Sequence, residues 1–202
     1  MTPNYLYKTY NLCGKVKPDF KFLELGTSTG VAFNSLTFNN KYTVDLKRPD
    51  LIQEHKNSFE QSTDDFFATT DLTDFDLIFI DANHDVEQVL RDFNSSVERI
   101  REGGVIVLHD CYPPTEEYCQ PRFCSDSYKI LEALARTGQE VTFAKDDFGV
   151  TLVLNAKPLD WRHVNYNLDY SSFVNKMANQ YRNTEVEYLD LLFSILENIQ
   201  KL

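Results

Sequence analysis

Acidic and histidine residues stand at the ends of four short apolar runs of the sequence. They are Glu24 with Gly26, Asp45, Asp81 with His84, and His109 with Asp110. Carboxylates can accept hydrogen bonds from hydroxyl and ammonium groups or bind metal ions, and imidazole titrates near neutral pH. In a doubly wound sheet, ligands bind beyond the carboxyl ends of the strands, where the strand order reverses. We therefore expect these residues to converge on one crevice.

The segment ELGTSTG, residues 24–30, has its two glycines four positions apart. It lacks the G-x-G-x-x-G spacing that brings a helix N-terminus against a pyrophosphate, which argues against a nicotinamide or flavin dinucleotide. A ligand with adenosine and no phosphate needs only Gly26 for close backbone approach, and Glu24 is then available to an ammonium group. Asp45 lies nineteen residues beyond Gly26, near the roughly twenty expected for an acid that accepts both ribose hydroxyls. The pattern indicates recognition of a nucleoside without phosphate.

Short apolar runs alternate along the sequence with segments of helical period. This pattern predicts an α/β fold, with a parallel sheet covered on both faces, and its strands and helices must position these residues. The expected strands are 20–25, 42–44, 77–80 and 105–108. We expect helices at 86–100 and at about 125–136, and another that begins within 27–30, where hydroxyls can cap its amides. Gly103-Gly104 should separate the helix at 86–100 from the next strand. A closing antiparallel hairpin of 141–143 and 150–154 completes a Rossmann-like, doubly wound sheet.

Residues 1–157 are expected to form this domain, and residues 158–202 a helical C-terminal extension. The extension carries an apolar stripe at helical spacing, made of Val186, Leu189, Leu192, Phe193, Ile195, Leu196 and Ile199. Such a stripe either packs on its own domain or forms the interface of a homodimer.

Charge and composition restrict the partners. The 202 residues carry a formal net charge of −11, and such a field repels nucleic acid. No apolar stretch is long enough for a membrane span and the N-terminus does not resemble a signal peptide, so we expect a cytoplasmic protein. The four cysteines are then free thiols, and their spacing with His109 fits no standard zinc pattern.

Four segments together resemble the successive motifs of class I S-adenosylmethionine-dependent methyltransferases. They are ELGTSTG at 24–30, Asp45, FIDANH at 79–84 with LRD at 90–92, and GGVIVLHD at 103–110. Within that class, D-x-x-H after the fourth strand and H-D after the fifth are similar to the macrocin O-methyltransferase type branch. The resemblance spans about residues 20–155.

The resemblance implies roles for individual residues. Glu24, Gly26, Thr27, Ser28 and Gly30 would hold the methionine part of S-adenosylmethionine and Asp45 the ribose. Ser62, Thr63 and Asp64 would hold the adenine edge, and Asp81 would also line the cofactor site. Thr151 and Tyr128 depart from the usual pattern, and both lie on the side of the methyl acceptor.

Transfer of a methyl group to an alcohol requires removal of the hydroxyl proton, and Asp81, His84 and His109 are the candidate bases. Each histidine alone could equally be structural, and the functional interpretation strengthens if both face one cleft. Metal-assisted relatives bind magnesium at positions that correspond to Asp81, His109 and Asp110. Mg²⁺ prefers oxygen ligands, and an imidazole at position 109 weakens that prediction.

The sequence thus predicts an S-adenosylmethionine-dependent O-methyltransferase that acts on a sugar or another small hydroxylated acceptor. The alternative is a non-catalytic cofactor-binding or scaffold protein with the same fold. A metal phosphohydrolase is disfavoured, because its H-D pair belongs on a helix and His109-Asp110 follows a strand.

Overall fold

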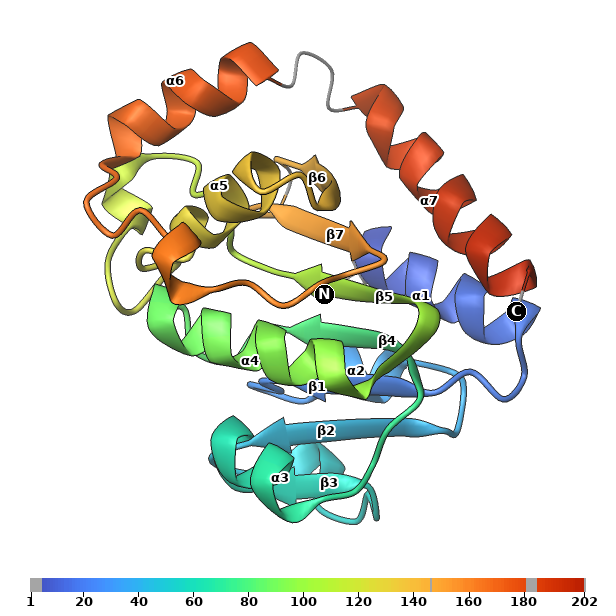
Figure 1. The fold of residues 1–202 in the computed structure, drawn as a ribbon. Coiled ribbons are helices and arrows are strands. Elements are labelled where there is room, and N and C mark those ends of the chain that lie inside the picture. The colour runs from blue at the N-terminus through green and yellow to red at the C-terminus, as the bar shows by residue number, and fades with distance from the viewer. Residues whose placement is uncertain (1–4, 146, 181–184, 202) are drawn as a thin grey trace.

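The computed structural model describes residues 5–145, 147–180 and 185–201, and its centre is a seven-stranded sheet of order β3-β2-β1-β4-β5-β7-β6. The first five strands run parallel, and β7 is antiparallel to both of its neighbours (Figure 1). The strands are β1 (Phe22–Leu25), β2 (Lys41–Asp45), β3 (Ser58–Glu60), β4 (Phe75–Ile80), β5 (Ile100–Leu108), β6 (Glu140–Ala144) and β7 (Val150–Leu154). The strand order reverses between β1 and β4, so their carboxyl ends open a crevice.

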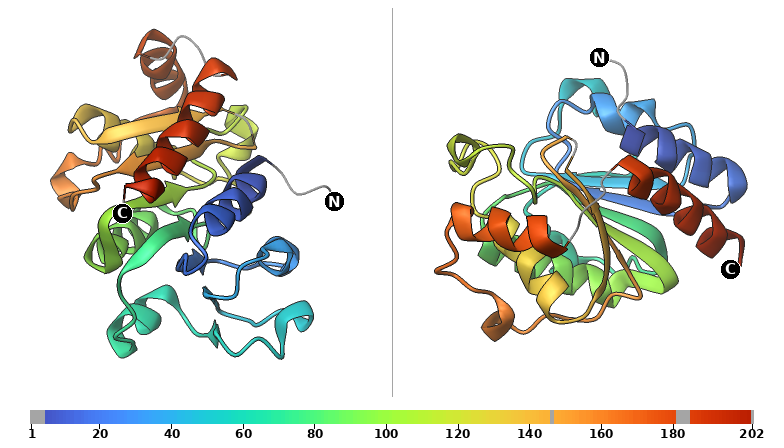
Figure 2. Two further views of the ribbon diagram at one scale, coloured as in Figure 1. Left: turned by 90° about the vertical axis from the view of Figure 1, so that its right-hand side faces the viewer. Right: turned by 90° about the horizontal axis from the view of Figure 1, so that it is seen from above.

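Helices cover both faces of the sheet (Figure 2). They are α1 (Tyr5–Val16), α2 (Val31–Ser35), α3 (Thr63–Thr69), α4 (Val86–Arg99), α5 (Tyr128–Arg136), α6 (Tyr170–Gln180) and α7 (Glu185–Gln200). Three 3₁₀ turns lie between them, at η1 (Asp50–Ile52), η2 (Glu116–Tyr118) and η3 (Trp161–His163). Helices α1, α2 and α7 cover one face and α3, α4, α5 and α6 the other.

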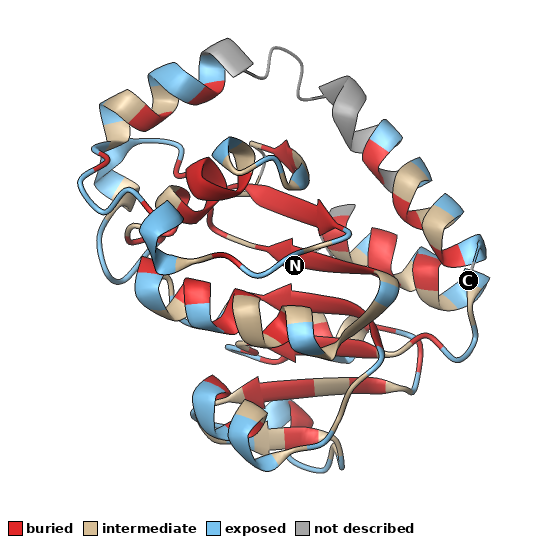
Figure 3. Cartoon of the chain, viewed as in Figure 1, coloured by how far each residue is buried: buried red, intermediate tan, exposed pale blue. Residues whose placement is uncertain are grey.

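The central strands are buried on both faces (Figure 3). Side chains alternate between two apolar clusters: Phe22 and Leu77 face α1 and α7, and their neighbours Leu23 and Ile78 face α4 and α5. This alternation follows from the two-residue period of a strand, and it explains why the runs read as almost unbroken apolar sequence. The predicted Rossmann-like α/β fold with a closing antiparallel hairpin is confirmed.

Two local predictions are wrong. The first is the helix cap after β1. Gly30 is the N-cap residue of α2, and no side-chain hydroxyl makes a capping hydrogen bond there. The free amides of Thr27 and Ser28 instead bind the carboxylate of Asp45. Gly103 and Gly104 do not separate α4 from β5, because β5 begins at Ile100 and both glycines lie within it, beside a register irregularity. Gly103 has φ +71°, a conformation that glycine adopts without strain.

The C-terminal helices pack against the rest of the chain. Phe173 and Met177 of α6 are buried with α5 in one core cluster, and Ile195 and Ile199 of α7 are buried with α1 in the other. Whether residues 158–202 also join two copies stays a prediction. Over the described ranges, none of the helices combines the length and apolarity needed to cross a membrane.

Candidate active site

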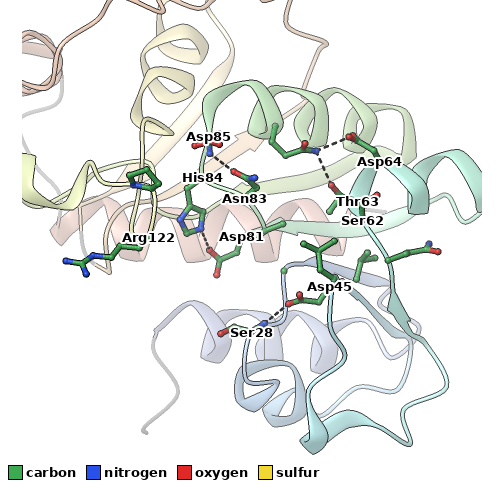
Figure 4. Close-up of a pocket in the computed structure, with 17 residues that line it drawn as sticks. Ser28, Asp45, Ser62, Thr63, Asp64, Asp81, Asn83, His84, Asp85 and Arg122 are labelled. Carbon is green, nitrogen blue, oxygen red and sulfur yellow. Dashed lines mark hydrogen bonds and ion pairs between the residues drawn. The ribbon is translucent and has the colours of Figure 1, made fainter.

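A cavity of about 560 Å³ lies beyond the carboxyl ends of β1, β2 and β4, where the strand order reverses. Figure 4 shows side chains from these strand ends and from the starts of α3 and α4 around one space. The predicted site residues that line it are Gly26, Ser28, Asp45, Ser62, Thr63, Asp64, Asp81 and His84. Of the strand-end residues expected to converge, Asp45, Asp81 and His84 meet in this cavity, and Glu24, His109 and Asp110 do not line it.

The loop after β1 passes directly against the end of β4. Gly26 has φ +88°, and a Cβ atom there would lie 2.1 Å from the carbonyl oxygen of Asp81. Any other side chain would collide with backbone as well as strain the main chain. Glycine at this position lets the two strand ends approach closely and leaves the space above them for a ligand.

Asp45 joins the ends of β1 and β2. Its Oδ2 atom accepts hydrogen bonds from the backbone amides of Thr27 at 2.8 Å and Ser28 at 2.9 Å. These bonds fix the carboxylate at the cavity wall, as Figure 4 shows for Ser28. An acid fixed in this way at the second strand end is placed to accept the two hydroxyls of a ribose.

Glu24 lies behind the cavity wall and is only 1% exposed. Thr43 donates a hydrogen bond to it at 3.3 Å, and Tyr7 of α1 is hydrogen-bonded to the same carboxyl. Burial, and then the negative charge of Asp81, raise the pKa of Glu24 to about 8. A buried carboxyl without a cationic partner in contact is unfavourable for folding, which is typical of a group retained for binding.

The start of α3 and the middle of α4 form the far wall. The amide nitrogen of Gln88 donates to Thr63 at 3.1 Å, to Asp64 at 3.2 Å and to Asp92 at 3.0 Å. Asp92 is fully buried, and burial raises its pKa to about 6. Gln88 lines the cavity, and its hydrogen bonds fix the side chains of Thr63 and Asp64, which are predicted to bind adenine.

A second cavity of about 410 Å³ adjoins the first and shares Ser28, Asp81, Ala82, His84 and Arg122 with it. His109 and Asp110 line only the second cavity. The remaining wall comes from the loop before α5 and the β6–β7 turn, through Phe123, Cys124, Asp147 and Phe148. Two adjoining cavities with shared side chains suit two ligands that must react with each other.

Two histidines and two aspartates form one charged cluster between the cavities. Nε2 of His84 lies 3.4 Å from Oδ1 of Asp81 and 3.2 Å from Oδ2 of Asp110. Nδ1 of His109 lies 3.2 Å from Oδ1 of Asp81 and 3.5 Å from Oδ1 of Asp110. Nε2 of His109 lies 3.5 Å from Oδ2 of Asp147. Both histidines therefore face one cleft, as the functional interpretation requires.

The carboxylates control the protonation of this cluster. Burial alone would raise the pKa of Asp81, but the charge of His109 and hydrogen bonds from both imidazoles lower it to about 2. Burial would lower the pKa of His84, but bonds to Asp81 and to the Phe123 carbonyl raise it to about 8. The pKa of His109 is raised well above its ordinary value against burial, first by the charge of Asp81 and then by Asp147.

The loops around the cluster adopt conformations that non-glycine residues rarely have. Positive φ values occur at Ser28 (+50°), Asp110 (+59°), Ser125 (+48°), Asp147 (+53°) and Phe148 (+64°). Gly149 follows at +95°, where a Cβ atom would lie 2.3 Å from the amide nitrogen of Tyr112. Such strain persists where the surrounding structure imposes it and is frequent at functional sites.

A divalent cation fits part of this cluster. One ligand atom each from Asp81, His84 and Asp110 lies within 4.8 Å of the others. His84 also contacts the carbonyl of Phe123 through Nδ1, the outer contact that usually orients a metal-binding imidazole. The predicted set of Asp81, His109 and Asp110 shares two of these residues. His84 is closer than His109 to Asp110, at 3.2 Å against 3.5 Å, whereas His109 is closer to Asp81, at 3.2 Å against 3.4 Å. Cysteine joins no such group in the part of the chain that the structure describes.

Three predicted cofactor residues are not among those that line the two cavities: Glu24, Thr27 and Gly30. Gly30 faces Pro49 and Ile52. Sequence reasoning in turn missed Gln88, Arg122, Asp147 and Phe148. Gln88 could have been found from its i, i+4 spacing to Asp92 on one helix face. The other three lie on loops whose positions depend on packing far away in the sequence.

The comparisons with known proteins agree with this geometry. Residues 23–111 match the family model described as a methyltransferase domain. The structure resembles an O-methyltransferase from Bacillus cereus in complex with SAH (17% identity, 76% of this chain and 82% of that chain, TM-score 0.56). It also resembles the SAH-bound methyltransferase PaMTH1 of Podospora anserina (14%, 76% and 79%, 0.56). A third is the sugar N-methyltransferase KedS8 from Streptoalloteichus sp. (13%, 75% and 87%, 0.51). No curated protein matches the sequence.

Residues 23–111 thus match a methyltransferase domain, and the chain has the fold of these methyltransferases. Asp45, Asp81 and His84 line the crevice at the strand ends of this fold.

Proposed function

We propose that the protein transfers the methyl group of S-adenosylmethionine to a hydroxyl of a sugar or another small hydroxylated acceptor. One observation carries this proposal. The cavity lined by Asp45 and Gly26 shares part of its wall with a second cavity lined by His109, and Asp81 lines both. A nucleoside site and a proton-accepting site thus meet at one carboxylate. The O-methyltransferase of Bacillus cereus and the sugar N-methyltransferase KedS8 share this fold and support the reaction class.

The first cavity suits the cofactor. Asp45 accepts hydrogen bonds from the ribose hydroxyls. Ser62, Thr63 and Asp64 contact the adenine edge, and hydrogen bonds from Gln88 orient Thr63 and Asp64. Gly26 and Ser28 offer close backbone approach to the methionine part. Glu24 acts from behind the wall, where a cofactor ammonium would stabilise its charged form.

In the reaction, the acceptor oxygen attacks the methyl carbon as the carbon–sulfur bond breaks. The electron pair of that bond stays on sulfur, S-adenosylhomocysteine leaves, and the hydroxyl proton passes to the base. We assign the base to His109. Asp81 lies at its Nδ1 atom, and Nε2 lies 3.5 Å from Asp147 in the wall of the second cavity, so the acceptor hydroxyl would take the place of that carboxylate at Nε2. A sulfonium beside Asp81 adds positive charge, which lowers the pKa of the imidazole toward the range of an effective base.

A divalent cation held by Asp81, His84 and Asp110 would supply a Lewis acid that lowers the pKa of the acceptor hydroxyl. Two carboxylates with an imidazole suit Mn²⁺, Fe²⁺ or Zn²⁺ better than Mg²⁺. If the metal takes part, chelator treatment abolishes transfer and added Mn²⁺ restores it more fully than Mg²⁺. Transfer that chelation leaves unchanged removes the metal from the proposal.

Calorimetry with S-adenosylmethionine and S-adenosylhomocysteine tests the cofactor. The native protein should bind both, and Asp45→Ala should bind neither well, with Asp50→Ala as a control acid outside the cavity lining. No detectable binding by the native protein ends the proposal. Binding without transfer to a broad panel of hydroxylated acceptors would favour the non-catalytic alternative.

A further inference from the structure

Arg122 lies at the junction of the two cavities and lines both of them. Their other charged lining residues are aspartates and the two histidines, so Arg122 is the one Lys or Arg side chain in the described lining. It belongs to the loop between η2 and α5, and Figure 4 shows it on the far side of His84 from the other labelled residues, with its guanidinium directed outward. A guanidinium kept at an acid-lined opening can attract a ligand that the surrounding carboxylates would repel.

The guanidinium of Arg122 is positioned by an aromatic ring. Its central carbon lies 5.0 Å from the ring centroid of Phe123. Within the described ranges, Arg122 has no ion pair with any of the nearby carboxylates. Stacking on a ring leaves the N–H edges of a guanidinium available, and those edges fit a carboxylate or phosphate with two parallel hydrogen bonds.

An aromatic surface adjoins this guanidinium. The ring of Tyr118 lies between Phe123 and Phe148, with centroid distances of 5.1 Å and 5.2 Å. Phe123 is 38% exposed and Phe148 37%, and both line the second cavity. Phe148 has φ +64°, an unfavourable backbone conformation for an aromatic residue, so the turn presents this ring at an energetic cost. Exposed aromatic faces pack well against the C–H face of a sugar ring.

We propose that the methyl acceptor is a sugar that carries an anionic group, either a carboxylate or a phosphate. Its ring lies against Phe123 and Phe148, its anionic group binds Arg122, and its reacting hydroxyl lies toward His109. This inference rests on the proposed function and specifies its acceptor.

Binding of three probes in the presence of saturating S-adenosylhomocysteine tests the proposal: glucuronate, glucose 1-phosphate and glucose. Calorimetry on the wild-type protein should show glucuronate or glucose 1-phosphate binding about tenfold or more tightly than glucose, since one bidentate charged contact is worth that much. Arg122→Gln should remove this preference and Arg122→Lys should keep part of it. The two anionic probes distinguish a carboxylate from a phosphate.

Two control variants make the result specific. Arg162→Gln removes one positive charge from an exposed arginine of η3 that pairs with Asp160, the N-cap residue of that turn. This variant should leave the affinities for all three probes unchanged. Phe148→Ala should weaken glucose and the anionic probes alike, because it removes the stacking surface and keeps the charge.

Each contrary outcome has a defined meaning. The inference is wrong if glucose binds as well as both anionic probes, if neither anionic probe binds, or if the preference survives Arg122→Gln. It is also wrong if Arg122→Gln weakens S-adenosylhomocysteine as strongly as the probes, since Arg122 then binds the cofactor carboxylate. Failure of the wild-type protein to bind S-adenosylhomocysteine overturns the proposed function first, before any sugar is added.

Discussion

Glu24 lowers the stability of the fold in a way that depends on pH. Its pKa is raised from 4.5 to about 8 in the folded protein. A group with a raised folded pKa stabilises the fold below its unfolded pKa, and this contribution is lost as pH rises through the folded value. We therefore predict that Glu24→Gln has nearly wild-type stability at pH 4.5 and is more stable by up to about 5 kcal/mol at pH 8.5, because each unit by which the pKa is raised corresponds to about 1.4 kcal/mol. Urea unfolding at both pH values measures this difference.

The same substitution should weaken S-adenosylmethionine, because an ammonium group loses a nearby carboxylate. Glu54→Gln, at an exposed acid, is the control and should change neither quantity at either pH. A Glu24→Gln variant that is destabilised at pH 8.5 would show that the carboxylate is paired, and that burial does not dominate its titration.

His109 should affect turnover far more than cofactor binding. It lines the second cavity and not the first, and Asp81 holds its Nδ1 atom. Loss of a positioned base costs about 100-fold or more in rate, so His109→Ala should reduce kcat by that factor and leave the Kd of S-adenosylhomocysteine within about twofold. His163→Ala, in the exposed turn η3, should change neither value. Equal losses in rate and affinity would mean that the role of His109 is misassigned.

At the scale of elements, the long apolar strands could be predicted and the short polar ones could not. Strands β1, β2, β4 and β5 are buried on both faces, and their short apolar runs predict buried strands of a parallel sheet. Strand β3 has three residues and α1 is not preceded by a clear start signal, so neither stood out. The mistaken helix cap has a tertiary cause. The amides of Thr27 and Ser28 find a carboxylate from β2, a partner that local sequence does not reveal.

The same limit applies to the candidate site. Strand-end residues such as Asp45 and Asp81 could be placed from sequence, because parallel strands deliver their carboxyl ends to one edge. Asp147 reaches His109 from a turn in the closing hairpin, and Arg122 reaches both cavities from a loop. Neither position follows from spacing, since each depends on how β7 pairs with β5 and on how the loop packs.

The glycine turns give a matched test at this scale. Gly26 and Gly138 both have positive φ, at +88° and +71°, but a Cβ atom at Gly138 meets nothing within 4 Å. Gly138→Ala should therefore cost only the backbone strain, about 1–2 kcal/mol, with cofactor binding unchanged. Gly26→Ala adds a collision with the Asp81 carbonyl and should abolish cofactor binding as well. Thermal unfolding and calorimetry on both variants separate strain from loss of the site. Cofactor binding retained in Gly26→Ala would show that the two strand ends can move apart.

For the whole molecule, the central question is whether the C-terminal helices belong to one folding unit with the sheet or serve to join two copies. Helix α7 offers a matched pair of residues for this question. Ile195 is 1% exposed and lies in the core cluster with Tyr10 and Phe22, whereas Phe193 on the same helix is 62% exposed. Ile195→Ala leaves a cavity in that core and should lower the free energy of unfolding by about 2–4 kcal/mol at any protein concentration.

Phe193→Ala separates the two possibilities. If α7 only packs on its own domain, the substitution removes an exposed ring and should change stability by no more than about 0.5 kcal/mol. If α7 joins two copies, the midpoint of unfolding of the wild-type protein should rise with protein concentration, and Phe193→Ala should remove that dependence. Sedimentation of both proteins measures the same difference directly. Because Ile195 and Ile199 pack against α1 and the sheet, we expect the first outcome for stability, with a loss at Ile195 several times larger than at Phe193.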